Sequence, residues 1–356
     1  MTDLQTDGRY RLVRQSLVAT PRTWLVTGAA GFIGSNLVEE LLSLGQTVVG
    51  LDDFSTGSEV NLGEVLGKTG GSTGTFRFIE GDIRDPAACR AASAGVDYVL
   101  HHAALASVPE SIADPITSCQ VNVDGFLNVL SAARDAGARR VVYASSSAVY
   151  GNTTNVPQVE SVVGEVLSPY AASKAANELY ATAFEQSYGI TTVGLRYFNV
   201  FGKRQDPNGA YAAVIPRWIA NLLEQVPCEI FGDGETTRDF LYVADVVQAN
   251  ILAATADAGI AKGVFNVACG KETSLNELFE MIRGALSRFQ PSIAASKATH
   301  SPARLGDIRR SLADISRTRQ VLGFAPRYRP ADGLREALEW YVARSSPPGF
   351  EVPAAR

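Results

Sequence analysis

The sequence has few of the residues that bind metals or form disulfides. Its 356 residues include three histidines and four cysteines. His101 and His102 are adjacent, which is poor geometry for two ligands of one metal, and only His300 remains, so we expect no metal site. The cysteines are scattered and form no Cys-x-x-Cys pair, which favours reduced thiols in a cytoplasmic protein. They are Cys89, Cys119, Cys228 and Cys269.

Long apolar runs are also missing. No stretch approaches the roughly 18 apolar residues of a membrane span, so we expect no membrane contact. Arginines interrupt the first 22 residues, which therefore lack the apolar core of a signal peptide; we expect a short amphipathic helix over 9–20 instead. The net charge of −5 gives no electrostatic reason to expect nucleic acid as a partner. A composition of 46% hydrophobic and 19% charged residues is typical of a globular protein with a large core.

A glycine-rich turn follows the first apolar segment. Residues 23–27 (TWLVT) are typical of a buried strand, and 35–42 have helical periodicity. Between them lie Gly28, Gly31 and Gly34, spaced as G-x-x-G-x-x-G rather than the commoner G-x-G-x-x-G. A strand, a glycine turn and a helix in this order form a dinucleotide fingerprint, with the diphosphate at the helix N-terminus near Phe32 and Ile33.

A second strand over 47–52 ends in an acid, Asp52, about twenty residues after Gly31. A carboxylate there binds the adenosine ribose hydroxyls and repels a 2′-phosphate. The sequence therefore predicts NAD rather than NADP as cofactor.

Tyr170 and Lys174 are spaced to share one face of a helix, one turn apart. A phenol has a pKa of about 10, and a nearby ammonium lowers it toward that of a useful base. The pair therefore predicts a base that takes a proton from a sugar or alcohol hydroxyl, although this motif alone is common on helices.

Strands and helices alternate through the first 200 residues, which predicts an α/β fold of the Rossmann type, with a doubly wound parallel sheet. Further strands are expected at 76–79, 98–101, 141–144 and 191–196, and helices around 34–44, 86–93, 116–136 and 170–188. We expect 240–243 and 264–267 to add strands to the same sheet. The predicted division is an N-terminal extension (1–20), an NAD-binding domain (21–200 and 236–270), a smaller substrate-binding lobe (201–235 and 271–345) and a tail (346–356).

Taken together, the motifs resemble the extended short-chain dehydrogenase/reductase family, and within it the UDP-hexose 4-epimerases, over roughly residues 20–343. The resemblance rests on the motifs TGAAGFIG (27–34), GDI (81–83), HHAA (101–104), SSSAVYG (145–151), YAASK (170–174), LRYFN (195–199), GETTRDF (234–240) and RLGD (304–307).

This resemblance implies catalysis by Tyr170, Lys174 and Ser146, with NAD regenerated in each cycle. Tyr170 would remove the proton of the sugar 4-hydroxyl, Lys174 would also bind the nicotinamide ribose, and Ser146 would hydrogen-bond the 4-oxygen. The implied cofactor-binding residues, beyond the fingerprint and this pair, are Gly57, Asp82, Ile83, Ala103, Asn122 and Tyr197. The implied substrate-binding residues, beyond Ser146, are Ser107, Ser147, Asn199, Ala213, Val214, Arg238, Arg304, Asp307 and Ser311.

The sugar is suggested by Ser311. The family branch that acts on galactose and glucose has a bulky tyrosine there, so a serine leaves room for a larger C2 substituent. The segment 205–216 and the N-terminal helix also resemble the branch that epimerises UDP-N-acetylglucosamine and UDP-N-acetylgalactosamine. We therefore expect these substrates, with UDP-glucose and UDP-galactose as further ones, and a family-type homodimer through the helices at 116–136 and 170–188.

Three alternatives compete with this interpretation. A UDP-uronic acid 4-epimerase could use the same arginines for a C6 carboxylate. Sugar-nucleotide dehydratases share the fold, but usually place Asp-Glu after a threonine where this chain has Ser146-Ser147-Ala148. A non-catalytic NAD-binding sensor is the third, and the intact Ser146, Tyr170 and Lys174 argue against it.

Overall fold

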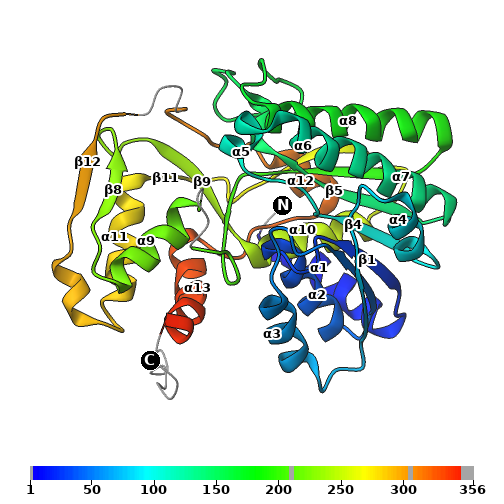
Figure 1. Ribbon diagram of the computed structural model, residues 1–356, viewed down its shortest axis with the longest axis horizontal. Coiled ribbons are helices and arrows are strands. Elements are labelled where there is room, and N and C mark those ends of the chain that lie inside the picture. The colour runs from blue at the N-terminus through cyan, green and yellow to red at the C-terminus, as the bar shows by residue number, and fades with distance from the viewer. Residues whose placement is uncertain (1–2, 208–211, 304–307, 346–356) are drawn as a thin grey trace.

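A computed structural model describes residues 3–207, 212–303 and 308–345. Its centre is a parallel sheet of seven strands in the order β10-β6-β5-β4-β1-β2-β3, with helices on both faces (Figure 1). The predicted Rossmann-type α/β fold is therefore confirmed. The strands are β1 (Thr23–Thr27), β2 (Thr47–Asp52), β3 (Thr75–Glu80), β4 (Tyr98–His101), β5 (Arg140–Ser146), β6 (Thr192–Tyr197) and β10 (Gly263–Val267).

The inner strands of this sheet are buried on both faces, as β1 illustrates, whereas the edge strand β3 has no fully buried residue. Trp24 and Val26 point toward the layer that contains α2 and α10, whereas Leu25 points toward the layer that contains α4 and α7. This explains the continuous apolar runs in the sequence. The first layer holds α1 (Asp3–Ala19), α2 (Phe32–Ser43), α3 (Glu59–Thr69), α10 (Val243–Thr255) and α12 (Ser316–Leu322). The second holds α4 (Pro86–Ser93), α7 (Gly125–Asp135) and α8 (Pro169–Tyr188).

The predicted N-terminal helix is present as α1, which packs against α10 and also contacts α2 through polar side chains. Tyr10 and Leu17 are buried, and the Tyr10 hydroxyl donates to Glu40 Oε1 at 3.1 Å. Gln46 Nε2 donates to the carbonyl of Leu17 at 2.9 Å. The extension is therefore part of the first helical layer.

The predicted helix over 116–136 is interrupted. It consists of α6 (Pro115–Cys119), a π-helical turn (Gln120–Asp124) and α7, preceded by α5 (Val108–Ala113). A π-turn adds one residue to the helical repeat, and periodicity alone does not reveal it.

The remaining strands form two small sheets. One has the order β11-β9-β7 and the other pairs β12 with β8. Their bounds are β7 (Asn199–Phe201), β8 (Cys228–Phe231), β9 (Thr237–Tyr242), β11 (Glu272–Ser274) and β12 (Ala298–Ser301). The prediction that 240–243 joins the main sheet was wrong. The place beside β6 is taken by β10, and β9 pairs instead with β7 and β11.

A separate apolar core lies in the C-terminal lobe, at the left of Figure 1. Trp218, Ile230, Phe279 and Leu338 are among its buried members. They come from β8 and from the helices α9 (Val214–Leu223), α11 (Leu275–Leu286) and α13 (Pro330–Ser345). α12 belongs instead to the core of the main sheet, where Leu322 is buried. The predicted domain boundaries stay a prediction.

The close contact between α2 and β1 predicts a strong effect of Gly34→Ala. A Cβ at position 34 would lie 1.9 Å from the carbonyl oxygen of Gly28, so the helix would have to move. We expect a loss of about 1–3 kcal/mol of unfolding free energy, measured by chemical denaturation. The matched control is Gly63→Ala in α3, where an added Cβ meets nothing within 4 Å. It should stabilise the helix by up to about 1 kcal/mol. Equal stability of the two variants would contradict the assigned contact.

Candidate active site

The predicted catalytic residues meet in one cleft of about 910 Å³. Ser146 ends β5, and Tyr170 and Lys174 lie in the first turns of α8, whose N-terminus Ser168 caps by accepting from the Ala171 N–H. The Tyr170 phenol and the Ser146 hydroxyl line this cleft together, and the proximity of Ser146 lowers the pKa of Tyr170. Lys174 Nζ lies 5.9 Å from the centre of the Tyr170 ring and donates to the carbonyl of Ala144 at 2.9 Å. An alcohol, a phenol and an amine are thus held together at the end of the sheet.

Burial changes the acidity of two of these groups. It lowers the pKa of Lys174 to about 8, because an ammonium is less stable away from water. Burial also raises the pKa of Tyr170, against the lowering effect of Ser146. We expected Lys174 to lower the pKa of Tyr170, but in this structure burial raises that pKa, and the lowering contribution comes from Ser146 and not from Lys174.

The glycine turn supplies a wall of backbone amides. Gly28 has a φ of +69°, and a Cβ there would lie 2.7 Å from the Ala103 nitrogen, so only glycine fits between β1 and the loop after β4. Gly31, Phe32 and Ile33 line the cleft at the start of α2. The free N–H groups of a helix N-terminus and its positive dipole end suit a diphosphate.

Asp52 lies in a smaller recess that shares Gly28 and Gly31 with the main cleft. It is 8% exposed, and its carboxylate accepts from the N–H groups of Ala30 at 2.9 Å and Phe54 at 2.8 Å. Burial raises the pKa of Asp52, and these backbone donors oppose that effect. Three other predicted cofactor residues line the same recess: Asp82, Ile83 and Ala103.

The π-turn before α7 presents Asn122. Its side chain accepts from the Leu105 N–H at 2.8 Å, and it donates to the Leu105 carbonyl at 3.0 Å and to Ser173 Oγ at 3.1 Å. Asn122 therefore links the loop after β4 to α8 at Ser173, which lies between Tyr170 and Lys174 in the sequence.

Sequence reasoning did not assign a role to His102, which lines the cleft beside Tyr197. Its Nε2 lies 2.9 Å from the Tyr197 hydroxyl, which also accepts from Asn250 Nδ2 at 2.8 Å. Burial lowers the pKa of His102 to about 3, so its imidazole is neutral. The HHAA motif at the end of a predicted strand was the signal that could have identified it.

The predicted substrate residues divide into three groups. Ser107, Asn199 and Ala213 line the cleft, as does Gly57 of the cofactor set. Ser147, Val214, Arg238 and Ser311 are not among the residues lining it in the described part of the chain; Arg238 Nη1 donates to the carbonyls of Thr237 and Ile308, and Ser311 is buried. Arg304 and Asp307 lie outside the described residues.

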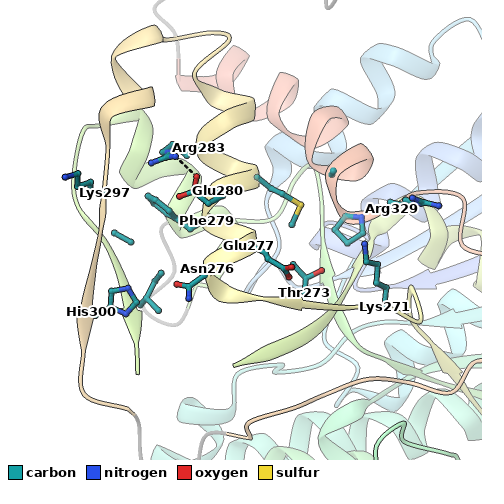
Figure 2. Close-up of a pocket in the computed structure, with 15 residues that line it drawn as sticks. Lys271, Thr273, Asn276, Glu277, Phe279, Glu280, Arg283, Lys297, His300 and Arg329 are labelled. Carbon is teal, nitrogen blue, oxygen red and sulfur yellow. Dashed lines mark hydrogen bonds and ion pairs between the residues drawn. The ribbon is translucent and has the colours of Figure 1, made fainter. Parts of the chain in front are cut away.

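A second groove of about 820 Å³ lies in the C-terminal lobe around α11 (Figure 2). Its acids serve local structure, since Glu277 caps α11 together with Ser274 and Glu280 pairs with Arg283. None of the predicted site residues lines this groove. The candidate active site is therefore the cleft at the carboxyl ends of the main-sheet strands.

Comparison with known proteins agrees with this geometry. The sequence model of the NAD-dependent epimerase/dehydratase family matches residues 24–268. The chain belongs to this family. It is 40% identical to a UDP-glucose 4-epimerase of Mycolicibacterium smegmatis, over 90% of this chain and 99% of the relative.

Solved structures agree as well. A UDP-N-acetylglucosamine 4-epimerase from Methanobrevibacter ruminantium, in complex with UDP-N-acetylmuramic acid, is 40% identical with a TM-score of 0.83, over 91% of this chain and 99% of that one. A UDP-glucose 4-epimerase from Thermus thermophilus, in complex with NAD, is 33% identical with a TM-score of 0.77, over 90% and 99%.

NAD is the cofactor, and the residues present fit it. The backbone wall at Gly28 to Ile33 matches a diphosphate, and the buried carboxylate of Asp52 matches ribose hydroxyls. When bound, NAD supplies a reversible hydride acceptor. Within the described residues, no helix is long and apolar enough to cross a membrane and no group of three potential metal ligands gathers.

Tyr170→Phe tests the assigned base. It removes the only atom of the side chain that can take a proton while keeping the ring, so we expect kcat to fall by about 100-fold or more. NAD should remain bound, as measured by its release on denaturation. The matched control is Tyr180→Phe, further along α8 with a side chain 42% exposed, which should keep full activity. A Tyr170→Phe variant with more than about a tenth of wild-type kcat would show that another group takes the proton.

Proposed function

We propose that this enzyme interconverts UDP-N-acetylglucosamine and UDP-N-acetylgalactosamine through a 4-keto intermediate, with UDP-glucose and UDP-galactose as slower substrates. The chain is an NAD-dependent UDP-sugar 4-epimerase and therefore an isomerase. The proposal concerns which sugar it takes. What supports it is the resemblance: this chain has Ser311 where the branch that acts on glucose and galactose has a tyrosine. Ser311 is buried and is not among the described residues that line the cleft, so the inference about the C2 pocket rests on this resemblance and on the related UDP-N-acetylglucosamine 4-epimerase.

The geometry supports a proton-transfer role for Tyr170 and Ser146. The Tyr170 oxygen takes the proton of the sugar 4-hydroxyl while the C4 hydrogen leaves as hydride, for which bound NAD would be the acceptor. Tyr170 gives the proton back to the 4-oxygen when the hydride is returned to the opposite face of the turned keto sugar. The Ser146 hydroxyl, which lines the cleft with Tyr170, holds the 4-oxygen in line with the base.

Lys174 keeps a positive charge in this setting while its pKa of about 8 lies above the ambient pH. Its contact with the Ala144 carbonyl fixes the ammonium beside the Tyr170 ring. A cation there stabilises the phenolate form of the base. Loss of the charge above pH 8 should therefore lower the fraction of Tyr170 that is present as phenolate.

The two relatives with 40% identity are named for different sugars. The Methanobrevibacter ruminantium enzyme is named for UDP-N-acetylglucosamine, and at the same 40% identity the Mycolicibacterium smegmatis enzyme is named for UDP-glucose. Identity therefore does not separate the two sugars, and Ser311 favours the larger one. A UDP-glucuronate 4-epimerase from Thermodesulfobacterium geofontis is 30% identical, so uronic acids belong in the test.

Ser311→Tyr tests the sugar assignment. A ring at this buried position should overlap the acetamide and lower kcat/KM for the two UDP-N-acetylhexosamines at least about tenfold. UDP-glucose and UDP-galactose, which have no acetamide, should change little. The control is Ser311→Ala, which keeps the space and should keep the wild-type preference. The measurement is kcat/KM for these four sugars and for UDP-uronic acids in all three proteins. An equal loss on all sugars would show that Ser311 does not line the C2 pocket, and a wild-type preference for uronic acids would replace the assignment.

The cytoplasmic location stays a prediction.

We also propose a homodimer whose interface buries part of α6 and α8. Ile116 on α6 and Leu179 on α8 are 69% and 74% exposed, and Tyr188 at the end of α8 is 55% exposed. Large apolar side chains gathered on packed helices are typical of an interface between copies. We expect a dimer by light scattering and a monomer for Leu179→Arg. A monomeric wild-type protein would contradict this proposal.

A further inference from the structure

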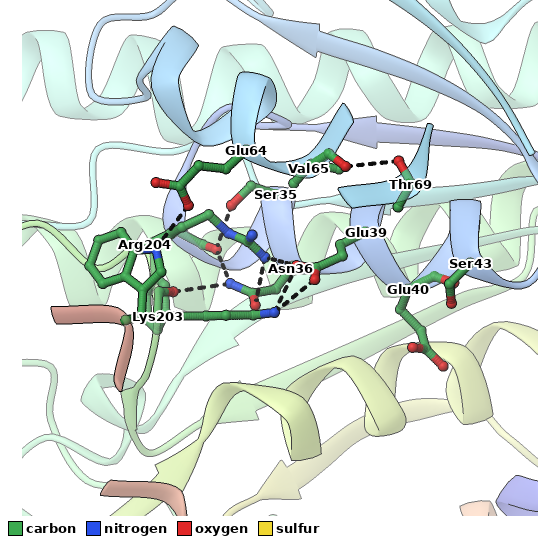
Figure 3. A network of polar contacts seen from close by, with 12 residues as sticks. Ser35, Asn36, Glu39, Glu40, Ser43, Glu64, Val65, Thr69, Lys203 and Arg204 are labelled. Carbon is green, nitrogen blue, oxygen red and sulfur yellow. Dashed lines mark hydrogen bonds and ion pairs between the residues drawn. The ribbon is translucent and has the colours of Figure 1, made fainter. Parts of the chain in front are cut away.

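A buried cluster of charges links α2 to the loop that follows β7, residues 202–207 (Figure 3). Glu39 on α2 receives two hydrogen bonds from Lys203 Nζ, at 2.8 and 2.9 Å, and forms an ion pair with Arg204. The Arg204 side chain is 0% exposed, and those of Glu39 and Lys203 are 20% and 26% exposed. Removing one partner of a pair this well shielded from water costs more than breaking a surface ion pair, because it leaves a buried charge without its counter-ion.

Asn36, one turn before Glu39, fastens the same loop. Its Nδ2 donates to the Lys203 carbonyl at 3.2 Å, and its Oδ1 accepts from Arg204 Nη2 at 2.9 Å. Arg204 has a φ of +67°, a left-handed conformation that side chains other than glycine rarely adopt. The bonds from Asn36 and Glu39 therefore hold a backbone shape that the loop would not keep by itself.

The loop is also held from the C-terminal lobe. The Tyr341 hydroxyl on α13 lies 3.2 Å from the carbonyl of Gly202 and 2.8 Å from that of Gln205. Next to it, Trp340 Nε1 donates to Glu64 on α3 at 2.8 Å. The loop thus lies between the NAD-binding part of the molecule and the lobe, with contacts to both.

This loop lines the same cleft as the catalytic residues, through Arg204, Gln205, Asp206 and Pro207. The cofactor side of α2 does not depend on the cluster, because the glycine turn and the packing of Gly34 fix its first turn. The described part of the loop, by contrast, is held by the charge cluster and by Tyr341. A break in the charge cluster should therefore move the loop and leave the amides at Phe32 and Ile33 in place.

We propose that Glu39 and Arg204 are positioning residues, which hold the 202–207 loop in the shape that receives the sugar nucleotide. This inference rests on the proposed function for the identity of the ligand. Neither residue takes part in the proton transfer. Their effect reaches the substrate through the loop, so it should appear in substrate binding and leave chemistry and NAD retention unchanged.

The charge state of the cluster is consistent with this role. Although burial alone would raise it, Arg204 and Lys203 hold the pKa of Glu39 below its ordinary value. Glu39 is therefore ionised at neutral pH. A substitution that removes its carboxylate leaves the buried Arg204 guanidinium without its anion.

The test is Glu39→Gln in the full chain with its NAD. We expect KM for the sugar nucleotide to rise at least about fivefold with kcat within about twofold of wild type, the pattern of lost substrate binding. NAD content after purification should equal that of wild type. The substrate is whichever UDP-sugar the wild type turns over best. If the sugar assignment is wrong, the substrate preference of the wild type shows it. The comparison of KM between Glu39→Gln and wild type remains valid.

The matched control is Glu40→Gln, one residue along the same helix. Glu40 faces α1, where it pairs with Arg14 at 3.0 Å and accepts from Tyr10. The two variants make the same chemical change, so a rise in KM for Glu39→Gln alone supports the inference. A fall in kcat with unchanged KM, or loss of NAD in step with activity, overturns it.

A second variant covers the case in which Glu39→Gln does not fold. Lys203→Gln removes the more exposed cation and leaves the Glu39–Arg204 ion pair in place. We expect a smaller rise in KM, about twofold or more, with unchanged kcat and an unfolding midpoint near that of wild type. If KM for this folded variant equals that of wild type, the loop does not depend on the cluster and the inference fails.

Discussion

The parallel pairing of β1 with both β2 and β4 is the constraint on which the active site depends. It brings the carboxyl ends of these strands to one edge, so that the glycine turn, Asp52 and His102 lie around one opening. Parallel strands need crossover helices, and those helices carry the other groups: α2 begins at the diphosphate wall and α8 carries the base. A change of strand order would separate residues that no local contact holds together.

Burial affects Lys174 and Arg204, two of the basic residues that line the cleft, in different ways. Lys174 is held by a backbone carbonyl, so burial lowers its pKa to about 8. Arg204 faces the carboxylate of Glu39, and this pair stays charged while it is withdrawn from water. The charge of Lys174 can therefore change with pH near 8. The Glu39–Arg204 pair gives a fixed link between two parts of the molecule.

The C-terminal lobe has its own apolar core, which also packs against Phe32 and Ile33 of α2, and a small set of polar contacts joins the lobe to the main domain. Trp340 and Arg344 bond to Glu64, and Tyr341 bonds to the loop after β7. A nucleotide sugar has to be held between a cofactor fixed on one part and a lobe on the other. Because the reacting atoms must align closely, these few contacts bear directly on catalysis.

The sequence by itself determined the doubly wound sheet and the pairing of Tyr170 with Lys174, because strand–turn–helix order and helical spacing are local properties. Ser146 joined this pair only through the resemblance to the family. Tertiary structure alone decided that β9 leaves the main sheet, since strand pairing depends on which neighbour occupies each edge. It also decided the π-turn at Asn122, the neutral state of His102 and the Glu39–Arg204 pair. Each of these arises from burial or from contacts between distant segments, which no local pattern of residues contains.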